Sequence, residues 1–89
     1  MISDWLSRVG SAIPRGFSRH YILELLAELP MTGKEIIDKA IVQTRGKWKP
    51  SPGLIYPLLG RLVEEGLIEE HENGRYRITK KGISIASDI

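Results

Sequence analysis

The sequence predicts one small, mainly helical domain with a β-hairpin near its C-terminal end. Three observations lead to this prediction. Apolar residues recur at helical spacing in several separate stretches, Asn73-Gly74 marks a tight turn between two short β-type segments, and 89 residues fit a single domain. The chain has no cysteine, which excludes a disulfide framework, a thiolate nucleophile and a cysteine-based zinc site.

Two amphipathic helices are expected in the first third of the chain. Residues 2–13 carry one apolar stripe, which stops before Pro14. Residues 18–29 carry a second stripe, with Ser18 as the expected cap and Pro30 as the expected end. The apolar positions are Ile2, Trp5, Leu6, Val9 and Ile13 in the first helix, and Tyr21, Ile22, Leu25, Leu26 and Leu29 in the second.

Cap motifs mark the beginnings of the next two helices. Thr32-Gly33-Lys34-Glu35 has the pattern of a capping box, and the helix it begins fades near residues 44–46. Ser51-Pro52 places a capping serine before a first-turn proline, and Gly66 is a natural end for this helix. Pro57 lies inside it, where a missing backbone hydrogen bond costs about 3 kcal/mol or bends the axis. Its apolar face consists of Leu54, Ile55, Leu58, Leu59, Leu62 and Val63.

Residues 67–79 are expected to form the hairpin, in one of two registers. A two-residue turn at Asn73-Gly74 would pair Glu69 with Ile78. A three-residue loop with a bulge at the glycine is favoured, because it places the apolar side chains on one face. That register pairs Ile68 with Ile78, Glu69 with Arg77, Glu70 with Tyr76 and His71 with Arg75. Thr79 then caps a last short helix over residues 80–88.

The element order α–α–α–α–β–β–α describes a winged helix-turn-helix with short N- and C-terminal helices. We divide the chain into an N-terminal helix at 1–16, the winged helix-turn-helix at 17–82 and a short C-terminal helix end at 83–89. This architecture does not settle the function, since winged helices bind DNA, RNA or other proteins.

Charge is distributed in blocks along the chain. The net charge is only +2, from 13 Lys and Arg against 11 Asp and Glu. Residues 39–63 contain basic side chains and no acid, residues 64–72 contain acids and no Lys or Arg, and Arg75, Arg77, Lys80 and Lys81 follow. The pattern predicts that one face of the folded domain is basic.

Several segments resemble the PadR-like family of transcriptional regulators. Residues 21–36 (YILELLAELPMTGKEI) resemble the opening of the family, and residues 48–62 (WKPSPGLIYPLLGRL) resemble its recognition helix and the preceding loop. Residues 64–68 and 75–82 resemble the two sides of its wing, so the resemblance covers about residues 17–82. It implies a homodimeric, cytoplasmic repressor that binds palindromic operator DNA and often releases it on binding a small molecule.

Two features depart from the family pattern. PadR-like proteins usually continue past the wing into long dimerisation helices, whereas this sequence ends at Ile89. Leu54 stands where the family often has a hydroxyl residue, which removes one potential phosphate or base contact. We therefore expect little room for a separate ligand domain, and no residue identifies an effector; a small-molecule pocket would lie between the termini and the helix at 18–29.

The DNA contacts are expected on the outer face of the helix at 51–65, in the loop before it and on the wing. A recognition helix enters the major groove with the face opposite its core, and phosphates meet basic side chains beside it. The resemblance implies a basic side chain at the wing tip, for which Arg75 is the candidate. The expected DNA-binding residues are Lys47, Lys49, Ser51, Gly53, Tyr56, Pro57, Gly60, Arg61, Arg75 and Arg77.

Each of these residues also has a purely structural interpretation. Tyr56 would be a partly buried ring, Gly53 and Gly60 would serve helix packing, and the two lysines would belong to a solvated loop. Trp48 is expected in the core or at a dimer contact rather than against a base.

A homodimer is expected because a small core gains from shared burial and an operator-binding protein needs a two-fold interface. The expected interface residues are Trp5, Leu6, Val9, Ile13, Ile83 and Ile85, together with Ile89. The alternative is that the N-terminal stripe completes the core of the monomer.

Enzymatic, metal-binding and membrane functions find no support in the sequence. His20 and His71 lie far apart without carboxylates at ligand spacing, and no apolar run approaches the roughly 18 residues that span a bilayer. We expect no cofactor and a soluble intracellular protein. The alternatives to a DNA-binding regulator are a winged-helix module for protein–protein interaction and a nonspecific DNA-coating protein.

Overall fold

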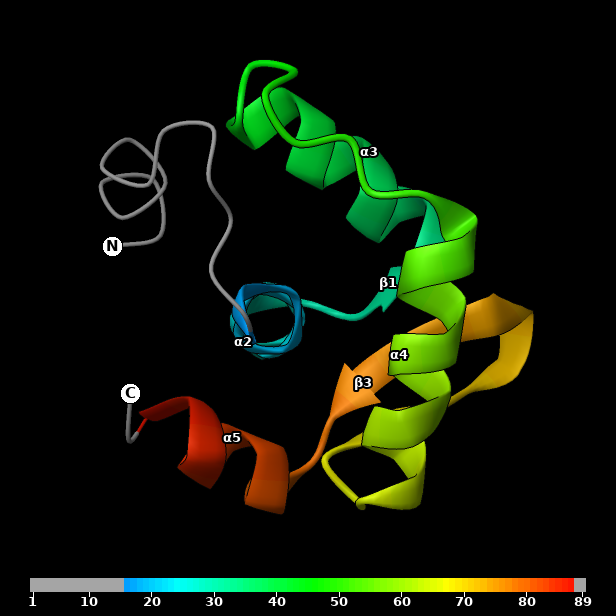
Figure 1. Ribbon diagram of the computed structural model, residues 1–89. Coiled ribbons are helices and arrows are strands. Elements are labelled where there is room, and N and C mark those ends of the chain that lie inside the picture. The colour runs from blue at the N-terminus through cyan, green and yellow to red at the C-terminus, as the bar shows by residue number, and fades with distance from the viewer. Residues whose placement is uncertain (1–15, 88–89) are drawn as a thin grey trace.

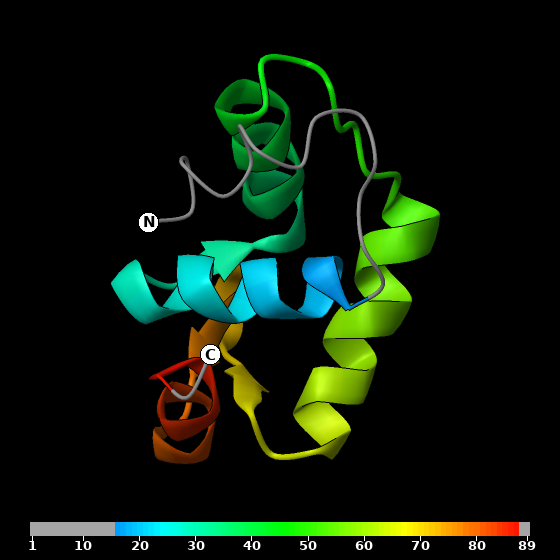
Figure 2. The same cartoon turned by 60° about the vertical axis from the view of Figure 1, so that its left-hand side comes forward.

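The computed structural model describes residues 16–87. Figures 1 and 2 show α2 at the centre, with α3 on one side of it, α5 on the other and α4 upright beside them. The expected helix at 2–13 lies outside the described residues. The elements are α2 (Phe17–Glu28), β1 (Met31–Thr32), α3 (Gly33–Gln43), α4 (Pro52–Glu64), β2 (Ile68–Glu70), a 3₁₀ turn (Glu72–Gly74), β3 (Arg75–Ile78) and α5 (Lys80–Ser87).

This is the winged helix-turn-helix that the sequence predicts, and its core is built around α2. Between Tyr21 and Leu26 every side chain of α2 except Glu24 is buried. A helix that is apolar on nearly all sides must be covered on nearly all sides, and α5 and β3 both contact it.

Both ends of α2 differ from the prediction. Ser18 is not the cap, because the helix begins one residue before it and the N-cap is Gly16. The φ of Gly16 is 82°, a left-handed conformation that glycine adopts at little cost. Leu29 does not continue the apolar face. It is an exposed C-cap in extended conformation, since the following Pro30 disfavours a helical backbone at this position.

The capping box of α3 is confirmed. The backbone N–H of Glu35 donates to Thr32 Oγ1 at 3.1 Å, and the N–H of Thr32 donates to Glu35 Oε1 at 2.8 Å. The capping role of Ser51 is confirmed as well, since its Oγ accepts the N–H of Leu54 at 3.3 Å.

Helix α4 ends where Gly66 predicts. Gly66 has a φ of 77°, and its N–H donates to the carbonyl of Val63 at 2.9 Å. The N–H of Leu67 donates to the carbonyl of Leu62 at 3.0 Å, and both of these side chains are buried. Together these bonds form a Schellman motif, which turns the chain out of α4 directly into β2.

The buried face of α4 is narrower than predicted. Its buried side chains are Ile55, Leu58, Leu59 and Leu62. Leu54 and Val63 are exposed, because the predicted stripe of six residues spans a wider arc than α3 and β2 cover.

The sheet has three strands in the order β1-β3-β2, and not only the two of the predicted hairpin. The favoured register is confirmed, with Ile68 opposite Ile78, Glu69 opposite Arg77 and Glu70 opposite Tyr76. Strand β1 was not expected. It pairs Met31 with Tyr76 and Thr32 with Arg75, and two residues are too short to give an alternating pattern in the sequence.

Helix α5 begins as predicted at a cap provided by Thr79. The N–H of Gly82 donates to Thr79 Oγ1 at 3.1 Å, and the N–H of Thr79 donates to the Leu67 carbonyl at 3.0 Å. The helix contacts α2 and runs continuously through the expected boundary after residue 82. Gly82 lies against the Leu67 carbonyl, which an added Cβ would approach to 2.2 Å.

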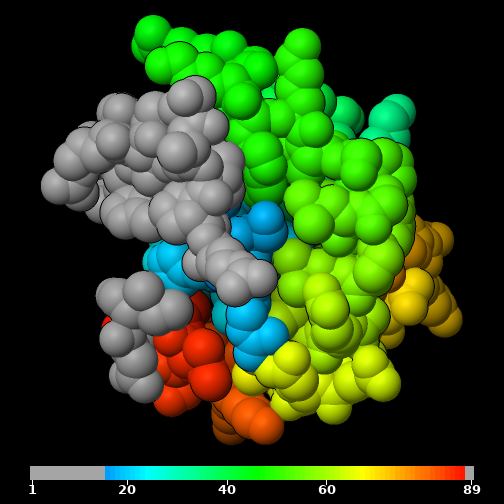
Figure 3. Space-filling view, viewed as in Figure 1, coloured from blue at the N-terminus to red at the C-terminus, as the bar shows by residue number. Residues whose placement is uncertain are grey.

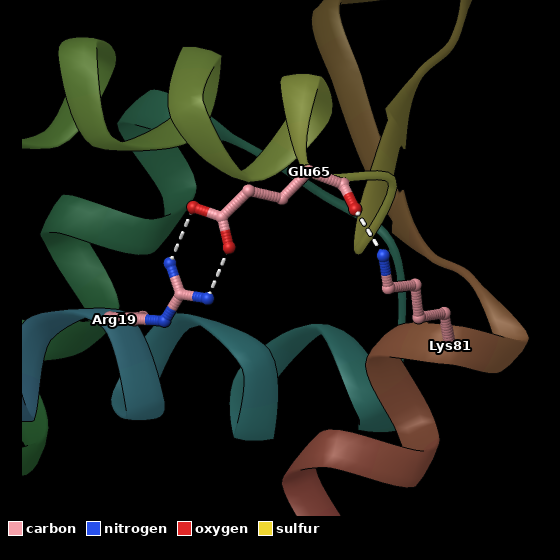
Figure 4. A network of polar contacts seen from close by, with 3 residues as sticks. All are labelled: Arg19, Glu65 and Lys81. Atoms are coloured by element: carbon pink, nitrogen blue, oxygen red, sulfur yellow. Dashed lines mark hydrogen bonds and ion pairs between the residues drawn. The ribbon is translucent and has the colours of Figure 1, made fainter.

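Glu65 connects three helices through polar contacts (Figure 4). Its carboxylate accepts two hydrogen bonds from the Arg19 guanidinium, of which Nη1 to Oε2 measures 2.9 Å. Its carbonyl accepts Lys81 Nζ at 2.9 Å. The hydrogen bonds from Arg19 lower the pKa of Glu65 below its ordinary value. The end of α4 is thereby joined to α2 and α5.

Two helical glycines predict opposite effects of the same substitution. We expect Gly82→Ala to destabilise the fold by about 1–3 kcal/mol, because the new methyl group meets a backbone carbonyl that can move only with β2. We expect Gly60→Ala to stabilise it by up to about 1 kcal/mol, because no atom of residues 16–87 lies within 4 Å of the Cβ that this substitution adds to α4. Urea unfolding of both variants measures the difference. Equal effects of the two substitutions would contradict the packing of α5 on the α4–β2 connection.

Candidate nucleic-acid interface

The loop between α3 and α4 presents two lysines on either side of a tryptophan that packs inward. The Trp48 ring contacts Phe17 and Tyr21 edge-on, with ring centroids 5.0 and 5.4 Å apart. This confirms the core interpretation of Trp48. Lys47 and Lys49 are exposed. The Trp48 ring therefore packs on the core, whereas the side chains of Lys47 and Lys49 on either side of it lie at the surface.

The beginning of this loop is held by Thr44. Its buried hydroxyl donates to the Ala40 carbonyl at 2.8 Å and accepts the N–H of Trp48 at 3.0 Å. The chain reverses through two residues with positive φ, Arg45 at 55° and Gly46 at 79°. The two lysines therefore lie on a loop that is fixed at Thr44 and again at Trp48.

Helix α4 follows with an outer face that contains no acid until Glu64. In the space-filling view, the loop and α4 form one continuous surface, and the hairpin turn lies beside it (Figure 3). The residues of α4 and its cap that we expected on this face are all exposed: Ser51, Gly53, Tyr56, Pro57, Gly60 and Arg61. Within the described residues, an added Cβ would meet nothing within 4 Å at Gly60 and only Ser51 Oγ at 3.7 Å at Gly53, so neither glycine is required for packing against another described helix or strand.

Tyr56 is both half-exposed and packed. It is 46% exposed, and its ring lies over Gly33, the first residue of α3. A Cβ at Gly33 would lie 2.6 Å from two ring carbons. This role of Gly33 was not predicted. A capping box does not require glycine at its second position, so the presence of glycine there was the one signal of a close neighbour that the sequence offered.

The wing, which is the hairpin β2–β3 with its turn, carries Arg75 and Arg77 on its solvent side. Both are exposed, but each has an acid as a neighbour. Arg77 is opposite Glu69, and Arg75 Nη1 lies 3.9 Å from Glu35 Oε1. Glu69, Glu70 and Glu72 are also exposed. The prediction of a basic face therefore holds for the loop and α4 more than for the wing, where the acids of β2 and the turn offset the arginines.

A small hollow of about 120 Å³ lies at the wing. It is lined by Pro30, His71, Glu72, Arg75 and Arg77.

Glu35 was predicted only as a capping residue. The contact between Glu35 and Arg75 was not predicted, because it depends on the unexpected strand β1, which joins α3 to the wing.

Two of the expected dimer residues fall within the described structure. Ile83 and Ile85 of α5 are 48% and 37% exposed. Trp5, Leu6, Val9, Ile13 and Ile89 lie outside the described residues.

The two histidines each face one carboxylate. His20 Nε2 lies 3.4 Å from Glu24 Oε1, and His71 Nε2 lies 3.3 Å from Glu69 Oε1. Within residues 16–87 no group of three His, Cys, Asp or Glu side chains could hold a metal ion. In the same part of the chain, none of the helices has the length and apolar character needed to cross a membrane.

Comparison with known proteins gives consistent matches. Residues 22–86 match the transcriptional regulator PadR-like family. The transcriptional regulator YqjI of Escherichia coli is 40% identical over 65 residues, which are 71% of this chain and 31% of that protein. Protein YqjI of Shigella flexneri matches to the same extent. This chain thus spans less than a third of the length of these relatives.

A solved structure is similar to this chain over most of the length of both proteins. It is a transcriptional regulator from Clostridium thermocellum, with 30% identity and a TM-score of 0.76. The match covers 83% of this chain and 79% of that one.

We predict that Gly33→Ala displaces the Tyr56 ring without unfolding the domain. The ring is the end of a half-exposed side chain and can move, so the free energy of unfolding should change by less than about 1 kcal/mol. The chemical shifts of the Tyr56 ring protons should change, because the ring must move away from the new methyl group. Gly53→Ala is the control and should leave the ring in place. Unchanged Tyr56 ring signals in Gly33→Ala would contradict the packing described.

Proposed function

The chain belongs to the transcriptional regulator PadR-like family, and from this membership we propose that it is a repressor that binds specific double-stranded DNA as a homodimer. Membership makes the chain a transcriptional regulator and not an enzyme. In the proposed complex α4 lies in the major groove of palindromic operator DNA, and the wing reaches the backbone or the minor groove.

One observation carries this proposal. The exposed face of α4, which carries no acid before Glu64, continues into a loop that holds Lys47 and Lys49 outward beside the helix N-terminus. Protein–DNA affinity depends chiefly on basic side chains at phosphates, and the N-terminal turns of a recognition helix meet the base edges. Loop and helix together offer both kinds of contact.

The residues of α4 suit close approach to a groove. Among residues 16–87, nothing lies within 4 Å of a Cβ added at Gly60 and only Ser51 Oγ does so at Gly53, so the helix backbone can come near the DNA there. Tyr56 presents the free part of its ring between them, where it can contact a phosphate or a thymine methyl group. Arg61, one turn further on, is placed for the backbone that borders the groove.

The wing contributes less positive charge than the loop. We propose Arg75 as its contact residue, with Arg77 as a weaker second because Glu69 lies opposite it. In this arrangement the loop and α4 supply most of the salt-dependent affinity, and the wing fixes the orientation of the domain on the duplex.

The homodimer completes the proposal. Ile83 and Ile85 leave apolar surface on α5, and a two-fold copy of the domain would cover it. A dimer of helix-turn-helix domains binds half-sites about 34–36 Å apart, which corresponds to one turn of the duplex. Selection of bound sites from random duplex DNA would show this spacing.

The first test removes the loop lysines. We expect Lys47→Ala with Lys49→Ala to weaken duplex binding roughly ten-fold and to lower the slope of log affinity against log salt by about two, one for each lost phosphate contact. Fluorescence anisotropy at several salt concentrations measures both quantities. The matched control is Lys39→Ala with Lys80→Ala, which removes the same charge from α3 and α5.

Other outcomes would favour other functions. If the wild type fails to bind duplex DNA, the DNA-binding proposal is wrong and a protein-interaction module becomes the better hypothesis. A specific regulator should prefer its selected site over random duplex by about 10³-fold or more. Equal affinity for both would indicate a nonspecific DNA-coating protein.

The second test concerns the dimer. We expect Ile83→Glu with Ile85→Glu to shift the protein from dimer to monomer in sedimentation equilibrium at micromolar concentration, because burying two carboxylates in an interface is costly. Val42→Glu is the control, because it places a carboxylate at an exposed apolar position of α3, outside the proposed interface, and should leave the dimer intact. A wild type that is already monomeric would refute the dimer.

A further inference from the structure

Glu35 makes two contacts with a single oxygen atom. Oε1 accepts the backbone N–H of Thr32 at 2.8 Å and lies 3.9 Å from Arg75 Nη1. The first contact completes the capping box of α3. The second reaches the first residue of β3, in the wing.

We propose that Glu35 is the resident counterion of Arg75 and that a DNA phosphate replaces it when the domain binds, so that Glu35 lowers the affinity for DNA. This inference rests on the proposed DNA-binding function. Glu35 would then have a role in DNA binding in addition to its structural role as a cap of α3.

Strand pairing sets the position of this contact. Thr32 is opposite Arg75 in the β1–β3 pair, and Glu35 is held to Thr32 by both bonds of the capping box. The carboxylate and the arginine are therefore held near each other by the backbone. Such a contact does not depend on a chance meeting of two long side chains.

The contact is an ion pair without a hydrogen bond. A separation of 3.9 Å exceeds the hydrogen-bond range, and within residues 16–87 the Arg75 guanidinium donates no hydrogen bond. Its five N–H donors are thus available, about half of the side chain is exposed, and the hollow at the wing borders it. A phosphate can accept two parallel hydrogen bonds from this group, whereas the carboxylate of Glu35 accepts none from it at 3.9 Å.

The charge of Glu35 persists whether or not Arg75 is near. The backbone N–H of Thr32 is the largest cause that lowers the pKa of Glu35 below its ordinary value, and Arg75 contributes less. At neutral pH the carboxylate therefore remains ionised after Arg75 leaves it. It then opposes DNA in two ways, because it competes for the guanidinium and repels the incoming phosphate.

Glu35→Gln separates the charge from the cap. Glutamine also completes a capping box, so α3 should keep its N-terminus and the thermal unfolding midpoint should change little. Asp38→Asn is the matched control, since it removes one negative charge from an exposed position further along α3. Arg75→Ala, and the double variant with Glu35→Gln, complete a cycle.

We expect Glu35→Gln to tighten binding to a duplex selected from a random pool by about three- to five-fold, the scale of a surface ion pair. Asp38→Asn should change affinity less. In the Arg75→Ala background, the gain from Glu35→Gln should fall to less than half of its value, because no guanidinium remains to be released.

The outcomes separate this inference from the proposed function. A wild type that binds no duplex refutes the proposed function, and the inference with it. A wild type that binds DNA while Glu35→Gln binds equally or more weakly overturns the inference alone. An equal gain with and without Arg75 also overturns it, since Glu35 would then act only as a general negative charge.

Discussion

Between Tyr21 and Leu26 helix α2 has a single side chain that reaches solvent, and the burial of the others determines where the remaining elements lie. Helix α5 and strand β3 pack on it from one direction, and Trp48 packs on Tyr21 from another. The Tyr21 hydroxyl donates to Gln43 at the end of α3, and burial raises the pKa of this phenol. The loop between α3 and α4 therefore packs on the core through Trp48, although Lys47 and Lys49 lie at the surface.

Local signals predicted the parts of this structure that neighbouring residues determine. The capping box at Thr32, the cap at Ser51, the Schellman end at Gly66 and the hairpin register all depend on contacts within a few residues or on a tight turn. Elements that depend on distant partners were missed. Strand β1 exists because β3 pairs with it, and Leu54 is exposed because no element covers that edge of α4.

The candidate site follows the same division. The exposure of α4 could be predicted from its helical period, because the outer face is the complement of the buried one. The roles of Gly33 and Glu35 could not, because each depends on a residue at least twenty positions away that the fold brings to the start of α3. At least one acid outside α4 and its loop has a structural role. Glu65 holds α2 and α5 to the end of α4, so this negative charge contributes to the fold.

The loop between α3 and α4 has a consequence for how such a domain can change over evolution. Its conformation is held by Thr44 and Trp48, and the backbone N–H of Lys47 donates to the Thr44 carbonyl, whereas within residues 16–87 the side chains of Lys47 and Lys49 make no hydrogen bond or ion pair. Substitution at the two lysine positions can therefore alter affinity for a polyanion with almost no effect on foldedness. A one-residue insertion or deletion between Thr44 and Trp48 would change both at once, because it would break the hydrogen bond between the Thr44 hydroxyl and the Trp48 N–H or pull the Trp48 ring away from Phe17 and Tyr21. Mutational drift in this segment should accordingly favour replacements over changes in length.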